Sequence, residues 1–136
     1  MKKKDRIYRQ KFTVTVEYDR NTGNLISKTW DRDGKLDCDL GEPAVTRYDA
    51  ATGNKLEERW MKDNLPSRYE MDGPATIFYD PVTGHPTRHI YYDEGKKSRL
   101  GGAAEIVFDS VSGKIIEEKF YRQGRLEHPA PKPSLP

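Results

Sequence analysis

The sequence contains one cysteine, Cys38, and only three histidines, which do not cluster with it. One thiol cannot close an intramolecular disulfide, and a structural zinc site needs four such ligands, so these residues exclude a disulfide-stapled domain and a zinc module. No apolar run approaches the roughly 18 residues of a membrane-spanning helix, and the basic start runs into charged residues rather than the apolar core of a secretory signal. We therefore expect a soluble, cytoplasmic protein without a membrane partner.

Hydrophobic residues are also scarce, at 34% of 136 residues, where an average globular protein has about 45–50%. A deep two-layer core is therefore not expected. The charged residues are nearly balanced, 24 basic to 22 acidic, which argues against a histone-like neutraliser of nucleic acid and against an acidic DNA mimic. A local basic excess occurs only in the N-terminal arm, residues 1–11, which contains Lys2, Lys3, Lys4, Arg6, Arg9 and Lys11.

The dominant pattern is an internal repeat of about 30 residues. A fixed period of this length is typical of proteins built from repeated structural units, so it is stronger evidence for the fold than any local pattern. Each unit has an aromatic residue, followed by aspartate, that precedes a turn glycine by five positions, at Tyr18, Tyr48, Tyr79 and Phe108. A second aromatic follows each glycine by seven positions, at Trp30, Trp60, Tyr91 and Phe120. A second turn comes four residues later, at Gly34, Asn64, Gly95 and Gly124.

The turn residues and the periodicity between them indicate β-hairpins. Asp19-x-x-Thr22-Gly23 has an aspartate to accept backbone N–H groups and a glycine for the left-handed conformation, and Asp33-Gly34 is a strong hairpin signal. Residues 12–18 alternate with a period of two, as in a strand. We predict an all-β fold of four tandem β-hairpin repeats in a twisted, elongated antiparallel meander of about eight strands. The predicted domain spans 12–128, with units 12–40, 41–72, 73–101 and 102–128, followed by a Pro-rich tail, 129–136.

The repeat also carries a family resemblance. Gly73-Pro74-Ala75, then Tyr79-Asp80-Pro81-Val82-Thr83-Gly84, and Trp60 with Asp63 one unit earlier, resemble the MORN-variant repeats of bacterial and phage proteins often labelled antitoxin-like. The resemblance implies an all-β module without a known catalytic centre, in a family whose members are mostly presumed to bind other macromolecules. This chain departs from the family pattern at Asn64-Leu65-Pro66 and at Ala103.

A row of polar residues is the strongest candidate site. Counted from each turn glycine, the fifth residues are Lys28, Glu58, His89 and Glu118, and the seventh are Trp30, Trp60, Tyr91 and Phe120. Both positions are predicted to share one sheet face, unless a bulge at the turn shifts the register. Because an unpaired buried charge is costly, we expect this face to be partly open and to bind a partner through these eight residues. The alternative is that the rings pack across strands and the polar row forms cross-strand ion pairs.

Metal binding and catalysis have weak signals. Asp31, Asp33, Asp37, Asp39 and Glu42 match several ligand positions of a calcium loop, but Leu36 stands where that loop needs glycine. His85, His89 and His128 lack a recurring nucleophile, although His89 beside Glu58 or Glu118 is a conceivable base–acid pair. Acidic neighbours disfavour a Cys38 thiolate. We expect no metal, cofactor or catalytic residue.

The sequence thus favours a non-catalytic protein-binding module that docks and neutralises or scaffolds a partner protein, like an antitoxin, an immunity protein or a phage inhibitor. The alternative is a nucleic-acid-binding sheet that uses the basic arm and exposed rings, with the steep salt dependence of phosphate contacts. Open sheet edges also allow a homo-oligomer.

Overall fold

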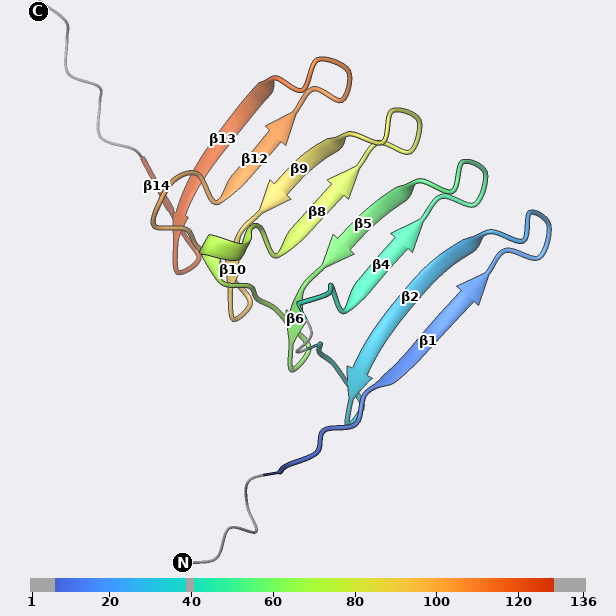
Figure 1. Cartoon of the computed structure of the whole chain (residues 1–136). Helices are drawn as coiled ribbons and strands as arrows, with labels where there is room; N and C mark the ends of the chain where they lie inside the picture. Colours follow the sequence, from blue (N-terminus) through green and yellow to red (C-terminus); the bar gives the residue numbers. More distant parts are fainter. Residues whose placement is uncertain (1–6, 39–40, 129–136) are drawn as a thin grey trace, which may run out of the picture.

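The computed structural model describes residues 7–38 and 41–128 and consists of antiparallel strands, which confirms the predicted fold class. The main sheet runs β1-β2-β4-β5-β8-β9-β12-β13-β14, with β3 paired to β2, and does not close on itself. Figure 1 shows the long strands side by side in one layer, with their connecting turns at one end and the short hairpins at the other. The described part contains no helix long and apolar enough to cross a membrane.

Eight longer strands form the four repeats: β1 (Thr13–Tyr18), β2 (Leu25–Arg32), β4 (Val45–Tyr48), β5 (Lys55–Arg59), β8 (Thr76–Tyr79), β9 (Pro86–Ile90), β12 (Glu105–Phe108) and β13 (Ile115–Arg122). The shorter strands are β3 (Lys35–Leu36), β6 (Met61–Lys62), β7 (Leu65–Pro66), β10 (Tyr92–Asp93), β11 (Lys96–Lys97) and β14 (Arg125–Glu127). A 3₁₀ turn, η2 (Glu70–Asp72), lies between β7 and β8.

The first turn of every unit is built in the same way. The Asp19 carboxylate accepts the Thr22 N–H at 2.8 Å, and Gly23 takes a φ of 75° that closes the loop. Asp49, Asp80 and Asp109 repeat this contact in the later units. These loop N–H groups hold the pKa of all four carboxyl groups below the ordinary value, because they stabilise the charged form.

The second turn differs from the simple meander that the sequence predicts. Instead of leading straight into the next long strand, it opens a short hairpin at the end of the sheet, such as β6–β7 or β10–β11. The hairpins bond to one another: the Asn64 N–H donates to the Leu36 carbonyl at 3.0 Å, and the Gly95 N–H to the Pro66 carbonyl at 2.8 Å. Each unit is therefore held by its neighbour at two places, as in other repeat proteins.

The core is thin, as the low hydrophobic content leads one to expect. Its buried apolar residues are Ala44, Ala75, Ile90, Tyr91, Ala103, Ala104 and Ile106. Carboxylates are buried beside them with cations as partners: Glu57 lies 2.8 Å from Arg59, and Glu105 lies 2.6 Å from Lys97. Ion pairs and small side chains thus fill the space that large apolar residues occupy in a two-layer fold.

Candidate functional site

The fifth-position residues form one continuous row across the sheet. Cross-strand pairing runs in the order Val16, Lys28, Thr46, Glu58, Ile77, His89, Ile106 and Glu118. Trp30 pairs with Val14, two residues from the Lys28–Val16 pair, so the seventh position lies on the same face. Register shifts do occur beside each first turn, but they leave this alternation intact. The shared face is therefore confirmed, and we call it the row face.

Two of the eight candidate residues are closed off. Glu58 is 8% exposed and Tyr91 is 9% exposed, so the expectation of an open surface is wrong at these positions. The Glu58 carboxylate is buried because it is satisfied: it accepts the Tyr79 hydroxyl and a hydrogen bond from Lys55 Nζ at 3.2 Å. Burial and this hydrogen bond to Glu58 raise the pKa of the Tyr79 hydroxyl above its usual range.

The remaining candidates keep part of their surface accessible. Glu118 is exposed, and the other five are half-buried: Lys28, Trp30, Trp60, His89 and Phe120. The Trp30 ring meets Phe12 edge-on at 6.3 Å between centroids, while Lys28 Nζ lies 5.4 Å from the Trp30 ring centroid. Trp60 donates its indole N–H to the Gly41 carbonyl at 3.0 Å. These rings therefore pack within the sheet and also present an edge, so both interpretations of the aromatic positions apply.

Two arginines that sequence reasoning missed belong to the same site. The Arg68 guanidinium carbon lies 3.7 Å from the Trp60 ring centroid, and that of Arg99 lies 4.0 Å from the Tyr91 ring centroid. Each Nη1 donates to a backbone carbonyl at 3.1 Å, Pro74 for Arg68 and Ala103 for Arg99. Arginine stacks well on aromatic faces. The sequence signal for both arginines is a Ser-Arg pair at the same distance after each ring.

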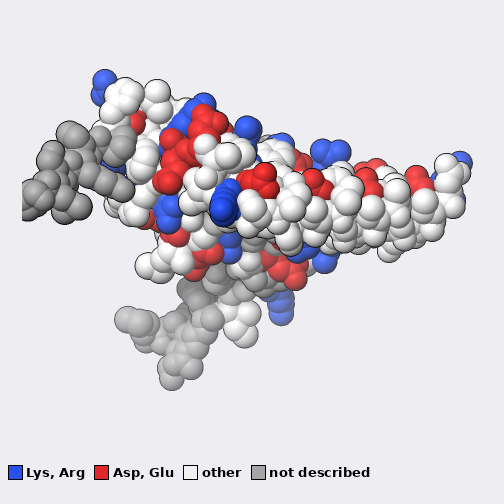
Figure 2. Space-filling model, turned by 90° about the horizontal axis from the view of Figure 1, so that it is seen from above, with Lys and Arg blue, Asp and Glu red and all other residues white. Residues whose placement is uncertain are grey.

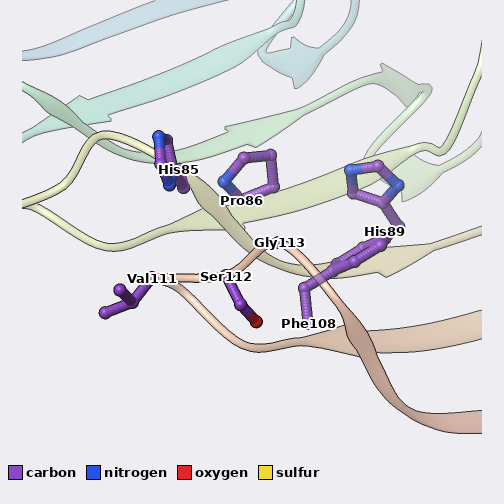
Figure 3. Close-up of a pocket in the computed structure, with 7 residues that line it drawn as sticks. All are labelled: His85, Pro86, His89, Phe108, Val111, Ser112 and Gly113. Carbon is purple, nitrogen blue, oxygen red and sulfur yellow. The ribbon is translucent and has the colours of Figure 1, made fainter.

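A hollow of about 310 Å³ lies beside the row face, between the first turns of the third and fourth units. Figure 3 shows the residues that line it: His85, Pro86, His89, Phe108, Val111, Ser112 and Gly113. The His89 and Phe108 rings meet edge to face with centroids 4.7 Å apart. Burial, and then the positive charge of Arg99, lowers the pKa of His89, so its ring is neutral at physiological pH and contributes an apolar wall.

A larger hollow of about 730 Å³ lies among the short hairpins and the linkers. Trp60 and Arg68 line it together with Cys38, Lys62 and Tyr69. Tyr69 and its neighbour Met71 are among the most exposed large side chains of the molecule, at 81% and 92%. The row face therefore ends in a polar recess with an apolar margin, a composition typical of binding surfaces.

The calcium and acid–base hypotheses gain no geometric support. Asp37 is committed to Arg32 Nη2 at 2.9 Å, and the described residues hold no cluster of three His, Cys, Asp or Glu side chains suited to a metal ion. Asp39 lies outside the described part. His89 has Ile77 and Ile106 as its cross-strand neighbours, which separate it from both Glu58 and Glu118. The conceivable base–acid pair is therefore not assembled.

The basic arm lies partly within the described residues. Arg9 and Lys11 are exposed, whereas Lys2, Lys3, Lys4 and Arg6 lie outside the described residues, as does the tail, 129–136. On the face drawn in Figure 2, basic and acidic atoms are interspersed among uncharged ones rather than gathered into a patch of one sign. That mixture is unlike the basic groove of a typical nucleic-acid binder.

In comparisons with known proteins, no family model, curated protein or solved structure matches the chain. The MORN-variant resemblance thus stays a prediction that rests on the repeated residues. The function of the site is therefore inferred from the geometry of the row face.

Proposed function

We propose that the chain is a non-catalytic, cytoplasmic module that docks a partner protein on the row face and thereby neutralises or scaffolds it. The observation that carries the proposal is the line of half-exposed rings and charged side chains on a single-layer sheet. Aromatic and arginine side chains are the residues that contribute most binding energy at protein interfaces. Here Trp30, Trp60 and Arg68 supply that chemistry.

The distribution of roles along the repeat supports the same proposal. The turn aspartates and the hairpin-to-hairpin bonds recur in the same form from unit to unit, so they build the scaffold. The fifth position instead changes from lysine to glutamate to histidine to glutamate. A rigid scaffold with a varied surface row presents a distinct charge pattern at low entropic cost on binding.

Binding of single-stranded nucleic acid is the second candidate. The Arg68–Trp60 and Arg99–Tyr91 stacks resemble platforms on which bases stack, and no salt bridge to a carboxylate within the described residues occupies either guanidinium. The row face itself carries charges of both signs, at Lys28 and Glu118, which favours a protein partner instead.

Adjacent residues of β13 offer a matched test of the proposal. Glu118 points to the row face and Glu117 to the opposite face, and both are exposed. The tagged full-length chain is used to capture partners from lysate of the organism that encodes it, after nuclease treatment, and the main partner is then titrated. Reversal of charge in Glu118→Lys should change the affinity at least several-fold, because that contact is central to the proposal.

The control variant, Glu117→Lys, carries the same charge reversal on the opposite face and should leave the affinity unchanged. Equal effects of the two variants, or none from either, would contradict docking on the row face. Recovery of nucleic acid that is lost on nuclease treatment and at higher salt would support the second candidate instead.

A further inference from the structure

The first strand, β1, is an open edge of the sheet. Among the described residues it pairs only with β2, and all six of its residues are exposed. Its Thr-Val-Thr-Val run has high β propensity and lacks the proline or inward-pointing charge that usually blunts an edge. Such an edge is a template for another strand.

The equivalent residues of the later units show which backbone groups of this edge point outward. The carbonyls of Ala44, Ala75 and Ala104 accept an N–H from the preceding unit, at 2.8, 2.7 and 2.7 Å. Val14 occupies the same repeat position, four residues before the first aromatic, and no described strand lies on that side of β1. Alternate residues point their N–H and C=O groups to the same side of a strand, so Val14 and Val16 direct theirs outward.

We propose that β1 is the interface of a homodimer, in which two copies pair antiparallel about a two-fold axis at Val14. Val14 then bonds to the Val14 of the second copy, and Val16 lies opposite Phe12 on the row face. On the other face, Glu17 lies opposite Lys11 in both symmetry-related positions. Opposite charges in these non-hydrogen-bonded pairs are close enough to attract. The proposal is independent of the docking function.

The charges select this register from its neighbours. Two neighbouring registers keep the same backbone pairing. One would set Glu17 opposite Thr13 and Lys11 opposite Asp19, and the other would set Glu17 opposite Arg9 and Lys11 opposite Thr15. The Asp19 carboxylate already accepts hydrogen bonds from its own turn. Of these three registers, the one centred on Val14 sets both Glu17 and Lys11 opposite a charge of the other sign that its own turn does not use. Lys11 lies two residues before β1, so this pairing extends the strand at its start.

The opposite edge of the sheet, at β13, is not a favourable alternative partner for β1. A head-to-tail contact of β13 with β1 would continue the repeat and pair Glu117 with Glu17, because Ser27 pairs with Arg47 in the first unit junction. Two like charges directly opposite are destabilising. Such a contact would also propagate into an open filament, whereas pairing of β1 with itself closes as a dimer.

Sedimentation velocity of the full-length chain over a range of concentrations tests the proposal. The wild type should show a monomer–dimer equilibrium, and Glu17→Lys should raise the dimer dissociation constant about tenfold, because two attractive pairs become repulsive. Lys11→Glu should do the same, and the double variant Lys11→Glu/Glu17→Lys should restore the dimer. Circular dichroism confirms that each variant is folded.

Glu117→Lys is the control and should leave the dimer unchanged. A head-to-tail assembly predicts the opposite sign, since Glu17→Lys would relieve its repulsion and strengthen association. The proposal is overturned by stronger association of Glu17→Lys, by failure of the double variant to recover, or by a monomeric wild type at all concentrations up to the millimolar range.

Discussion

Removal of one cation from the buried Glu105 cluster tests whether ion pairs replace a hydrophobic core in this fold. Glu105 Oε1 lies 2.6 Å from Lys97 Nζ, and Glu105 Oε2 lies 3.6 Å from Arg88 Nε. The Lys97 and Glu105 side chains are 31% and 9% exposed. We expect Lys97→Met to destabilise the protein, because it removes the shorter of these two cation contacts from a buried carboxylate.

The size of this loss of stability follows from the burial of the two side chains. A hydrogen bond to a charged group contributes about 1.5–3 kcal/mol, and partial exposure of Lys97 with the remaining Arg88 contact reduces this to about 1–2 kcal/mol. For a chain of this size that corresponds to a fall in melting temperature of about 4–10 °C. The matched control is Lys62→Met: Lys62 Nζ lies 3.3 Å from Glu94, but both side chains are more than 60% exposed. Its effect on the melting temperature should be much smaller, because solvent screens this exposed ion pair.

The pH dependence of the same variant has a defined sign. Burial alone would raise the pKa of Glu105, but the hydrogen bond and charge of Lys97 outweigh it and hold the pKa below its ordinary value. The stability from this pair is therefore present above the ordinary glutamate pKa and is lost as the pH falls below it. Wild type and Lys97→Met should converge on acidification in thermal melts followed by circular dichroism. Equal, small effects of Lys97→Met and Lys62→Met at neutral pH would refute the reasoning.

Three further predictions concern the turns and one ring. The Thr83 and Val82 N–H groups hold the pKa of Asp80 low, so its contribution to stability is lost as the pH falls below about 4, and Asp80→Asn should flatten the acid limb of a plot of melting temperature against pH. Gly84 has a φ of +76° with open space around it, so Gly84→Ala should cost about 1–2 kcal/mol of backbone strain in urea unfolding. Trp60→Ala should cost about 2–4 kcal/mol by the same assay; unchanged stability would mean that the ring does not support the sheet.

The parts of the fold that local chemistry decides could be predicted from the sequence. Asp19 and Gly23 make their turn through contacts within five residues, so their spacing was sufficient evidence. The alternation in β1 likewise fixed which residues share a face. The short hairpins are only partly local: Asn64 bonds to Leu36 of the preceding unit, and a turn motif alone does not reveal that contact.

The site was less predictable because its decisive contacts join different units. Glu58 was expected to be open, but it is buried by Tyr79 of the next unit, a partner that spacing along one strand does not reveal. Linker contacts were also invisible: the Glu70 carboxylate accepts the N–H groups of Leu100 and Gly101, at 2.6 and 2.8 Å, thirty residues further on. Side chains whose role depends on a neighbouring repeat need the three-dimensional register.

The thin core bears on how such a protein could acquire a binding surface. In a two-layer fold most large side chains are fixed by packing, so a change of partner disturbs the core. Here the buried positions are mostly alanines and paired carboxylates, while the hydrogen bonds of turns and hairpins hold successive units together. A fifth-position residue can therefore vary where its neighbours leave it exposed, as at Glu118, and is constrained where the next unit supplies a partner, as at Glu58. The contacts at each repeat junction, rather than the packing of the whole sheet, therefore determine which residues of the docking surface can vary.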